Sequence, residues 1–367
     1  MNKKILLPYI SRSGHNIHSK TVGGGIEKFV KNIYEVFPYS IPVEITPKDR
    51  AEGNTQKVFN YAFRKYKPDI IIVNDIDACF TVPMIKLGIP TIAIVHEPLA
   101  RDIRYVAWWK DIHKFIDAGG HLYFVSENQK NFHDKNIKRI SNKSLAGIKG
   151  TINSSFSDGS EFVPKRKHLL YDAVTIGRTD LTKNPFLLHK KLQSTNLSSC
   201  VITNGNNFQH SDNQKKYWND NLHWEKPQYT FRGLNHKDTL KTMSEAACYV
   251  STCSVESWGI TVLEALLHGV PVIILSDKSG KHSSEIIPAD PNHFKILHKN
   301  VSSEELAKTI NMFKSKYRIY EDRLEISEAT KKKHSKEKWV DKLKEIVYHR
   351  KFNIPEQPSL IRFLHDD

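Results

Sequence analysis

Three stretches of this sequence have a continuous apolar centre instead of alternating between apolar and polar residues. They are PDIIIVND (68–75), PTIAIVHE (90–97) and PVIILS (271–276). A strand is apolar on both sides when helices cover both faces of its sheet, which is typical of parallel sheets. Helical patterns stand between such stretches, for example GGGIEKFVKNIYEVF at 23–37, where apolar residues recur every three or four positions. This alternation predicts an α/β fold with doubly wound parallel sheets.

The chain is long enough for two domains, since a single core rarely grows beyond about 250–300 residues. Two series of strand–helix units run along its 367 residues, separated by an irregular polar stretch at 153–167. We therefore expect an N-terminal domain at 1–155 and a C-terminal domain at 168–330, both Rossmann-like and facing each other across a cleft. A last helical segment, 331–367, is expected to return to the N-terminal domain. Within that domain, Asn54 is a candidate N-cap for a helix.

The charge, apolar runs and cysteines of the chain limit which classes of protein it can belong to. Lys and Arg number 55 against 40 Asp and Glu, a formal net charge of +15. This surplus favours polyanionic partners such as nucleic acid or anionic lipid, although it would also serve solubility alone. No apolar run reaches the roughly 18–20 residues of a membrane-spanning helix, and the opening MNKKILLPYI is interpreted as a buried strand, not a signal peptide. The four cysteines form no Cys-x-x-Cys pair, so a cytoplasmic protein without disulfides or zinc is expected.

The segment CSVESWGITVLEALLHGVPVIILS places two carboxylates around a strand-to-helix junction. Glu256 lies in the turn, Gly259 ends it, and a helix is predicted to begin near Ile260. The first turn of a helix leaves backbone N–H groups unpaired at the positive end of its dipole, which suits a phosphate. Glu264 lies further along this helix between apolar residues, an unusual place for a free charge. The alternative is a capping role for Glu256 and a surface position for Glu264.

The E-x7-E spacing of this segment resembles the donor site of retaining GT-B glycosyltransferases of the family-four type. Three other segments agree in order: GGGIEKF (23–29), TIAIVHEP (91–98) and the G-R-x4-K pattern of GRTDLTK (177–183). The resemblance covers nearly the whole chain and implies catalytic roles for Glu256 and His96. It implies that the donor is bound by Gly24, Gly25, Arg178, Lys183, Ser257, Gly259, Ile260, Thr261 and Glu264. The plainer alternatives are a surface position for Arg178 and a core position for His96.

The resemblance also implies the chemistry. A nucleotide-diphosphate sugar, UDP-linked by family frequency, is the co-substrate, and no prosthetic group is expected. Arg178, Lys183 and a helix N-terminus together stabilise the charge of the departing diphosphate, so no metal is required. Attack on the same face as the leaving group replaces a carboxylate nucleophile, and Glu256 positions donor hydroxyls. Asp75 and Asp77 are interpreted as residues of a strand-end loop, not metal ligands.

The acceptor is less constrained, and His15, His18 and Lys20 are the candidate residues that contact it. One hypothesis is double-stranded DNA carrying hydroxymethylcytosine, as for the phage DNA glucosyltransferases that share this architecture, with the enzyme in the host cytoplasm. The charge surplus fits a duplex, and the base would be flipped into the site. The alternative is a cell-envelope enzyme that builds lipopolysaccharide, capsule or teichoic-acid glycans at an anionic membrane surface. A third class, a non-catalytic binding protein, is disfavoured by the intact donor residues.

Overall fold

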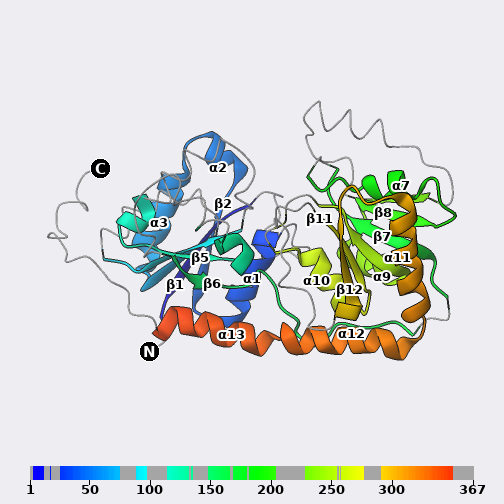
Figure 1. The fold of residues 1–367 in the computed structure, drawn as a ribbon. Helices are drawn as coiled ribbons and strands as arrows, with labels where there is room; N and C mark the ends of the chain where they lie inside the picture. Colours follow the sequence, from blue (N-terminus) through cyan, green and yellow to red (C-terminus); the bar gives the residue numbers. More distant parts are fainter. Residues whose placement is uncertain are drawn as a thin grey trace. The chain divides into compact units, whose positions relative to one another are not determined.

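The chain divides into two compact units, which are described separately. The computed structural model describes residues 3–11, 17, 25–74, 88–96, 114–131, 134, 148–165, 168–179, 182–203, 228–253, 256, 258–276 and 291–349. Unit 1 comprises Met1–Ser155 and Glu337–Asp367, and unit 2 comprises Phe156–Lys336 (Figure 1). Unit 2 is therefore inserted into the sequence of unit 1, and the chain passes from one unit to the other twice.

Unit 1 contains a six-stranded sheet in the order β2-β1-β3-β4-β5-β6, with every neighbouring pair parallel. The strands are β1 (Ile5–Ile10), β2 (Ser40–Ile45), β3 (Ile70–Asn74), β4 (Thr91–Val95), β5 (His121–Phe124) and β6 (Ile148–Thr151). The helices are α1 (Gly25–Val36), α2 (Pro47–Ala51), α3 (Thr55–Tyr66) and α13 (Lys336–Lys344), followed by the π-helical turn η5 (Glu345–His349). All residues of β3, β4 and β5 are buried, as expected for strands covered on both faces.

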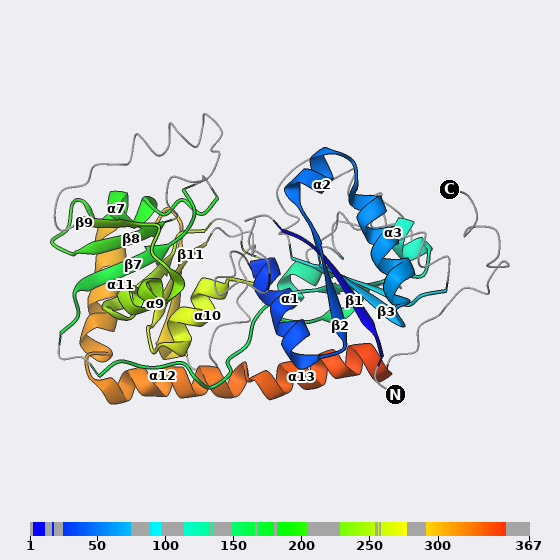
Figure 2. The same cartoon turned by 180° about the vertical axis from the view of Figure 1, so that it is seen from behind.

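Helices α1 and α3 flank β1 and β2 (Figure 2). Phe59 of α3 belongs to the same apolar cluster as Leu6 of β1. Phe29 of α1 is fully buried and meets Trp339 of α13 edge-on, with ring centroids 5.7 Å apart. The indole Nε1 of Trp339 donates to the carbonyl of Asn153 at 2.8 Å. The C-terminal helix is thus part of the core of unit 1.

Unit 2 contains a second parallel sheet, in the order β12-β11-β10-β7-β8-β9. The strands are β7 (Tyr171–Ile176), β8 (Ser199–Thr203), β9 (Gln228–Arg232), β10 (Ala246–Ser251), β11 (Val272–Ser276) and β12 (Phe294–His298). The helices are α7 (Leu187–Leu192), α9 (His236–Ser244), α10 (Ile260–Leu267), α11 (Ser303–Lys316) and α12 (Tyr320–Lys333), with a 3-10 turn, η4 (Pro291–His293). Strand order reverses between β7 and β10, and in unit 1 between β1 and β3. Ligands of doubly wound sheets bind at the carboxyl ends of such strands.

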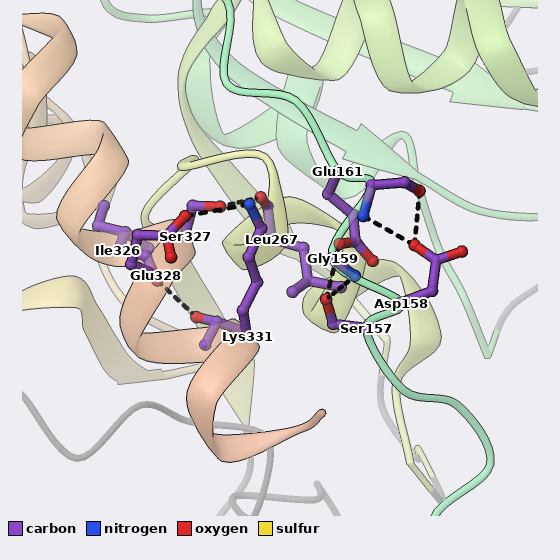
Figure 3. A network of polar contacts seen from close by, with 11 residues as sticks. Ser157, Asp158, Gly159, Glu161, Leu267, Ile326, Ser327, Glu328 and Lys331 are labelled. Carbon is purple, nitrogen blue, oxygen red and sulfur yellow. Dashed lines mark hydrogen bonds and ion pairs between the residues drawn. The ribbon is translucent and has the colours of Figure 1, made fainter. Parts of the chain in front are cut away.

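Helix α12 holds the end of α10 in unit 2. Ser327 donates its hydroxyl to the carbonyl of Leu267 at 2.5 Å (Figure 3). Arg323 is buried, and its Nε donates to the carbonyl of Gly269 at 2.9 Å. Gly269 adopts φ +71°, and a Cβ at this position would collide with the backbone carbonyl of Arg323. These contacts hold the end of α10, the helix whose N-cap is Gly259.

The two segments through which the chain leaves and re-enters unit 1 are hydrogen-bonded to each other. Ser157 donates its N–H to the carbonyl of His334 at 2.7 Å and accepts from the N–H of Lys336 at 2.8 Å. The hydroxyl of Ser157 donates to Glu161 at 2.6 Å and accepts from the N–H of Gly159 at 3.1 Å (Figure 3). The polar stretch 153–167, predicted as irregular, therefore contains a hydrogen-bonded turn near its start.

The two parallel, helix-covered sheets confirm the predicted fold class. The predicted cap of α3 is wrong. Asn54 precedes the helix, but it has helical rather than extended backbone angles, and its side chain donates to Glu52 at 3.0 Å. Among the described residues, no helix is long and apolar enough to cross a membrane.

Candidate active site

A lysine and a glutamate from neighbouring strand ends meet at the switch point of unit 2. Lys183 follows β7 and Glu256 follows β10, and the two strands pair directly, with Tyr249 opposite Val174. The Lys183 ammonium donates to Glu256 Oε2 in an ion pair whose side chains are only 25% and 19% exposed. Burial opposes the charged form, but the Glu256 carboxylate outweighs it and holds the pKa of Lys183 above its ordinary value. The Lys183 ammonium is therefore charged at neutral pH.

The backbone around Lys183 is held by small side chains. Thr252 donates its hydroxyl to the carbonyl of Lys183 at 2.7 Å and lies 3.4 Å from the hydroxyl of Thr175 on β7. Gly177 begins the G-R-x4-K segment, and a Cβ there would come within 3.0 Å of Lys183 Cβ. These contacts position the ammonium without contributing charge of their own.

Helix α10 begins one turn after Glu256 with the geometry that suits an anion. Gly259 has φ +79° and ψ +60°, and its carbonyl accepts from the N–H groups of Val262 and Leu263 at 2.9 and 3.2 Å. A glycine adopts these angles without strain and has no side chain to cap the first-turn N–H groups. Ile260 is the first helical residue. The positive end of α10 thus follows Glu256, the acidic partner of Lys183, in the same loop.

Thr261 and Tyr249 join this helix to the strand before it. Their hydroxyls lie 3.1 Å apart. Burial raises the pKa of Tyr249 to about 12, partly offset by the hydrogen bond with Thr261. The phenol therefore stays neutral and serves as a hydrogen-bonding brace. Contact of Thr261 with the nucleotide sugar stays a prediction, since the Thr261 hydroxyl already lies beside Tyr249.

Glu264 lies on α10 with a histidine beside its carboxylate. His236, the first residue of α9, places its Nε2 2.9 Å from Glu264 Oε1. The histidine side chain is 63% exposed and the glutamate 14%. Glu264 is therefore neither a surface residue nor a charge without a partner. Arg178, two residues after β7, is exposed, which leaves its guanidinium accessible from the same strand end.

In unit 1, His96 follows β4 at the carboxyl edge of the sheet. Its Nε2 lies 3.5 Å from Asn74 Oδ1 at the end of β3, a long contact. Its ring meets Phe29 edge-on at 4.9 Å. His96 is half-buried, so it is not simply a core residue. Glu27, in the first turn of α1, is buried at the same edge.

Several predicted residues lie outside the described part of the chain. They are His15, His18, Lys20, Gly24, Asp75, Asp77 and Ser257. Gly25 is the first residue of α1. Within the described ranges, no group of three or more His, Cys, Asp and Glu side chains could hold a metal ion.

Sequence reasoning did not identify His236, Thr252 or Tyr249. All three lie near their partners only because the strands and helices of unit 2 pack as they do. Gly177 had a detectable signal, since it is the first residue of the G-R-x4-K pattern. Its role, close approach to Lys183, is visible only in the structure.

The family comparison concerns unit 2. Residues 162–333, nearly all of unit 2, match the family model described as glycosyl transferases group 1. No protein of curated function matches the sequence.

Solved structures with a similar fold include HepE, WaaB and TarM. HepE from Anabaena, in complex with UDP and glucose, aligns with a TM-score of 0.70 and 15% identity over 94% of this chain and 99% of its own. The lipopolysaccharide outer core galactosyltransferase WaaB aligns with a TM-score of 0.64 and 14% identity over 94% and 99%. TarM aligns with a TM-score of 0.62 and 16% identity over 80% of this chain, which spans only 58% of TarM. At these identities the likeness establishes the fold alone.

Proposed function

We propose that this chain, which has a GT-B fold and matches a glycosyltransferase family model over residues 162–333, transfers a sugar from a UDP-sugar to a hydroxyl with retention of configuration. The observation that carries the proposal is the Lys183–Glu256 ion pair at the switch point, three residues before the turn that starts α10. A cation and a helix N-terminus suit the diphosphate of a nucleotide sugar, and the nearby carboxylate suits the hydroxyls of its sugar. The nucleotide is chosen because HepE was solved with UDP and with UDP-glucose.

Each residue has a distinct role in the proposal. Lys183, Arg178 and the N–H groups at the start of α10 bind the diphosphate and stabilise the charge that grows on it as the sugar leaves. No metal ion is then needed. Glu256 accepts hydrogen bonds from sugar hydroxyls, and Glu264 accepts them from the ribose.

The reaction proceeds on one face of the sugar. The bond between the anomeric carbon and the diphosphate oxygen breaks, and its electron pair stays with that oxygen. The acceptor oxygen forms its bond to the anomeric carbon from the same side, and its proton passes to the departing diphosphate. His96, at the carboxyl edge of unit 1, contacts the sugar or the acceptor.

We propose further that the acceptor is a negatively charged macromolecule. Helix α3 carries Lys57, Tyr61, Arg64 and Lys65 at helical spacing, all exposed, and contains no acidic residue. The Lys65 ammonium lies 5.6 Å from the ring centroid of Tyr61. Such a basic and aromatic face binds phosphate-rich polymers. DNA containing hydroxymethylcytosine is the first candidate acceptor.

A second candidate is a cell-envelope glycan. It is favoured by the comparison with WaaB, which acts on the lipopolysaccharide outer core. A basic face on α3 would meet the anionic surface of a membrane as readily as a DNA duplex.

One experiment tests donor, stereochemistry and acceptor together. The enzyme is incubated, with and without EDTA, with UDP-glucose, UDP-galactose or a UDP-pentose and either hydroxymethylcytosine DNA or a lipopolysaccharide core. Digested DNA and glycan are then weighed by mass spectrometry, and the anomer of any product is assigned by NMR. An α-linked product from an α-linked donor, formed in EDTA, is expected. A β-linked product would overturn retention, and loss of turnover in EDTA would overturn metal independence.

Two variants test the role proposed for Arg178. Arg178→Ala should reduce turnover sharply, whereas Lys190→Ala, which removes an exposed cation from α7, should not. Equal turnover in both variants would contradict the role given to Arg178. Absence of a mass gain on DNA with a gain on the lipopolysaccharide core would select the second acceptor.

A further inference from the structure

Glu264 has a partner that the proposed reaction does not use. His236 is the first residue of α9, and its place is fixed by the cap of that helix. Asn235 accepts from the N–H of Asp238 at 2.9 Å and donates from its amide to the Asp238 carboxylate at 2.6 Å. From this anchored position the imidazole reaches Glu264 Oε1 on α10 at 2.9 Å.

A carboxylate in the position of Glu264 needs such an anchor. Its neighbours Leu263 and Ala265 are buried, while the Glu264 side chain itself is 14% exposed at the edge of the helix. A glutamate side chain has several torsions, and holding one rotamer costs conformational entropy. A hydrogen bond to one carboxylate oxygen sets the plane of the group before a ligand arrives, which lowers the cost of binding.

We propose that His236 is a positioning residue that orients Glu264 for the ribose of the donor. The inference rests on the proposed function, in which Glu264 accepts from the ribose hydroxyls. The Nε2–H of the imidazole donates to Oε1, and the carboxylate then presents its remaining lone pairs to the diol in a fixed plane. His236 acts through Glu264, so its contribution exists only when the ligand has hydroxyls for Glu264 to bind.

This dependence supplies the test. Calorimetry measures the dissociation constants of UDP and 2′,3′-dideoxy-UDP for the full-length wild type and for His236→Ala, His236→Gln and Lys241→Ala. UDP binding should weaken about three- to tenfold in His236→Ala, which is less than the loss of a direct hydrogen bond to a charged group would cause, because His236 acts on UDP only through Glu264. Binding of the dideoxy analogue should not change. His236→Gln, whose amide can donate from nearly the same place, should recover most of the loss.

Lys241→Ala is the matched control, because Lys241 is exposed on the same helix. It should bind both nucleotides as the wild type does. A merely structural role for His236 would weaken both nucleotides equally or lower only the melting temperature, and either result would overturn the proposal.

Glu264→Gln separates this inference from the proposed function. If that variant loses affinity for UDP but not for the dideoxy analogue while His236→Ala loses none, the ribose contact stands and the positioning role is wrong. If Glu264→Gln binds both nucleotides like the wild type, the ribose contact itself is wrong. Failure of the wild type to bind UDP would overturn the donor assignment and this inference with it.

Discussion

Replacing Glu256 by glutamine should strengthen the binding of UDP while it weakens sugar transfer. Glu256 neutralises Lys183 when no donor is bound. A diphosphate that recruits Lys183 must therefore compete with this carboxylate. Glutamine has nearly the same shape without the charge, so it removes the competitor and also removes the acceptor for sugar hydroxyls. UDP lacks the sugar and reports only the first effect.

The burial of the pair sets the size of the effect. Exposed ion pairs contribute at most about 1 kcal/mol, whereas hydrogen bonds to charged groups contribute about 1.5–3 kcal/mol. The Lys183 and Glu256 side chains are 25% and 19% exposed, between these two cases. A value of about 1.5 kcal/mol corresponds to roughly a tenfold change in affinity. The dissociation constant of UDP should thus fall by about tenfold in Glu256→Gln.

Calorimetric titration of UDP into four proteins tests this expectation: wild type, Glu256→Gln, Lys183→Met and the double variant. Lys183→Met should bind UDP more weakly than the wild type, because it removes a diphosphate ligand. The double variant should match Lys183→Met, since no ammonium is left for the glutamate to occupy. Unchanged or weaker UDP binding in Glu256→Gln would refute competition between the carboxylate and the diphosphate.

Three further predictions concern unit 2. Burial lowers the pKa of His189 from 6.5 to about 4, so the unfolded chain binds a proton at a higher pH than the folded chain does. The free energy of unfolding should have its full value above about pH 6.5 and fall by about 3 kcal/mol by pH 4. Urea unfolding of His189→Gln should lack this loss. Gly269→Ala, which combines positive φ with a collision against Arg323, should cost more than about 2 kcal/mol in the same assay, whereas Gly53→Ala, with φ +68° and no atom within 4 Å, should cost less. The isolated segment Phe156–Lys336, a compact unit, should fold and bind UDP within about tenfold of the full chain by calorimetry; an unfolded segment, judged by circular dichroism, would contradict its independence.

The fold was predictable because burial on both faces leaves a direct signature in the sequence. Every residue of β3, β4 and β11 is buried, and each of these strands contains four consecutive apolar residues. The strand β12 lacks that signature, since Lys295 and Ile296 are exposed and, among the described strands, β11 alone pairs with it. The predicted N-cap of α3 was wrong for a different reason. Asparagine is common at N-caps, but an N-cap needs an extended backbone that Asn54 does not adopt.

The site was predictable only in part. Glu256 was recognisable from the strand-to-helix junction around it, whereas Lys183 was identified through the resemblance of its G-R-x4-K segment to the glycosyltransferase family. Their contact with each other spans 73 positions of sequence. The partner of Glu264 is 28 positions away, on another helix. Such contacts depend on the order of strands in the sheet, which no single segment encodes.

The insertion of one unit into the other also orders events during synthesis. The ribosome completes Phe156–Lys336 before it releases the residues that contain α13. Until then Phe29 lacks Trp339, and the carbonyl of Asn153 lacks its indole donor. The nascent chain can therefore finish folding unit 2 first, whereas unit 1 is completed only after its last segment has been translated. A premature stop before α13 would spare the second half and leave the first without part of its core.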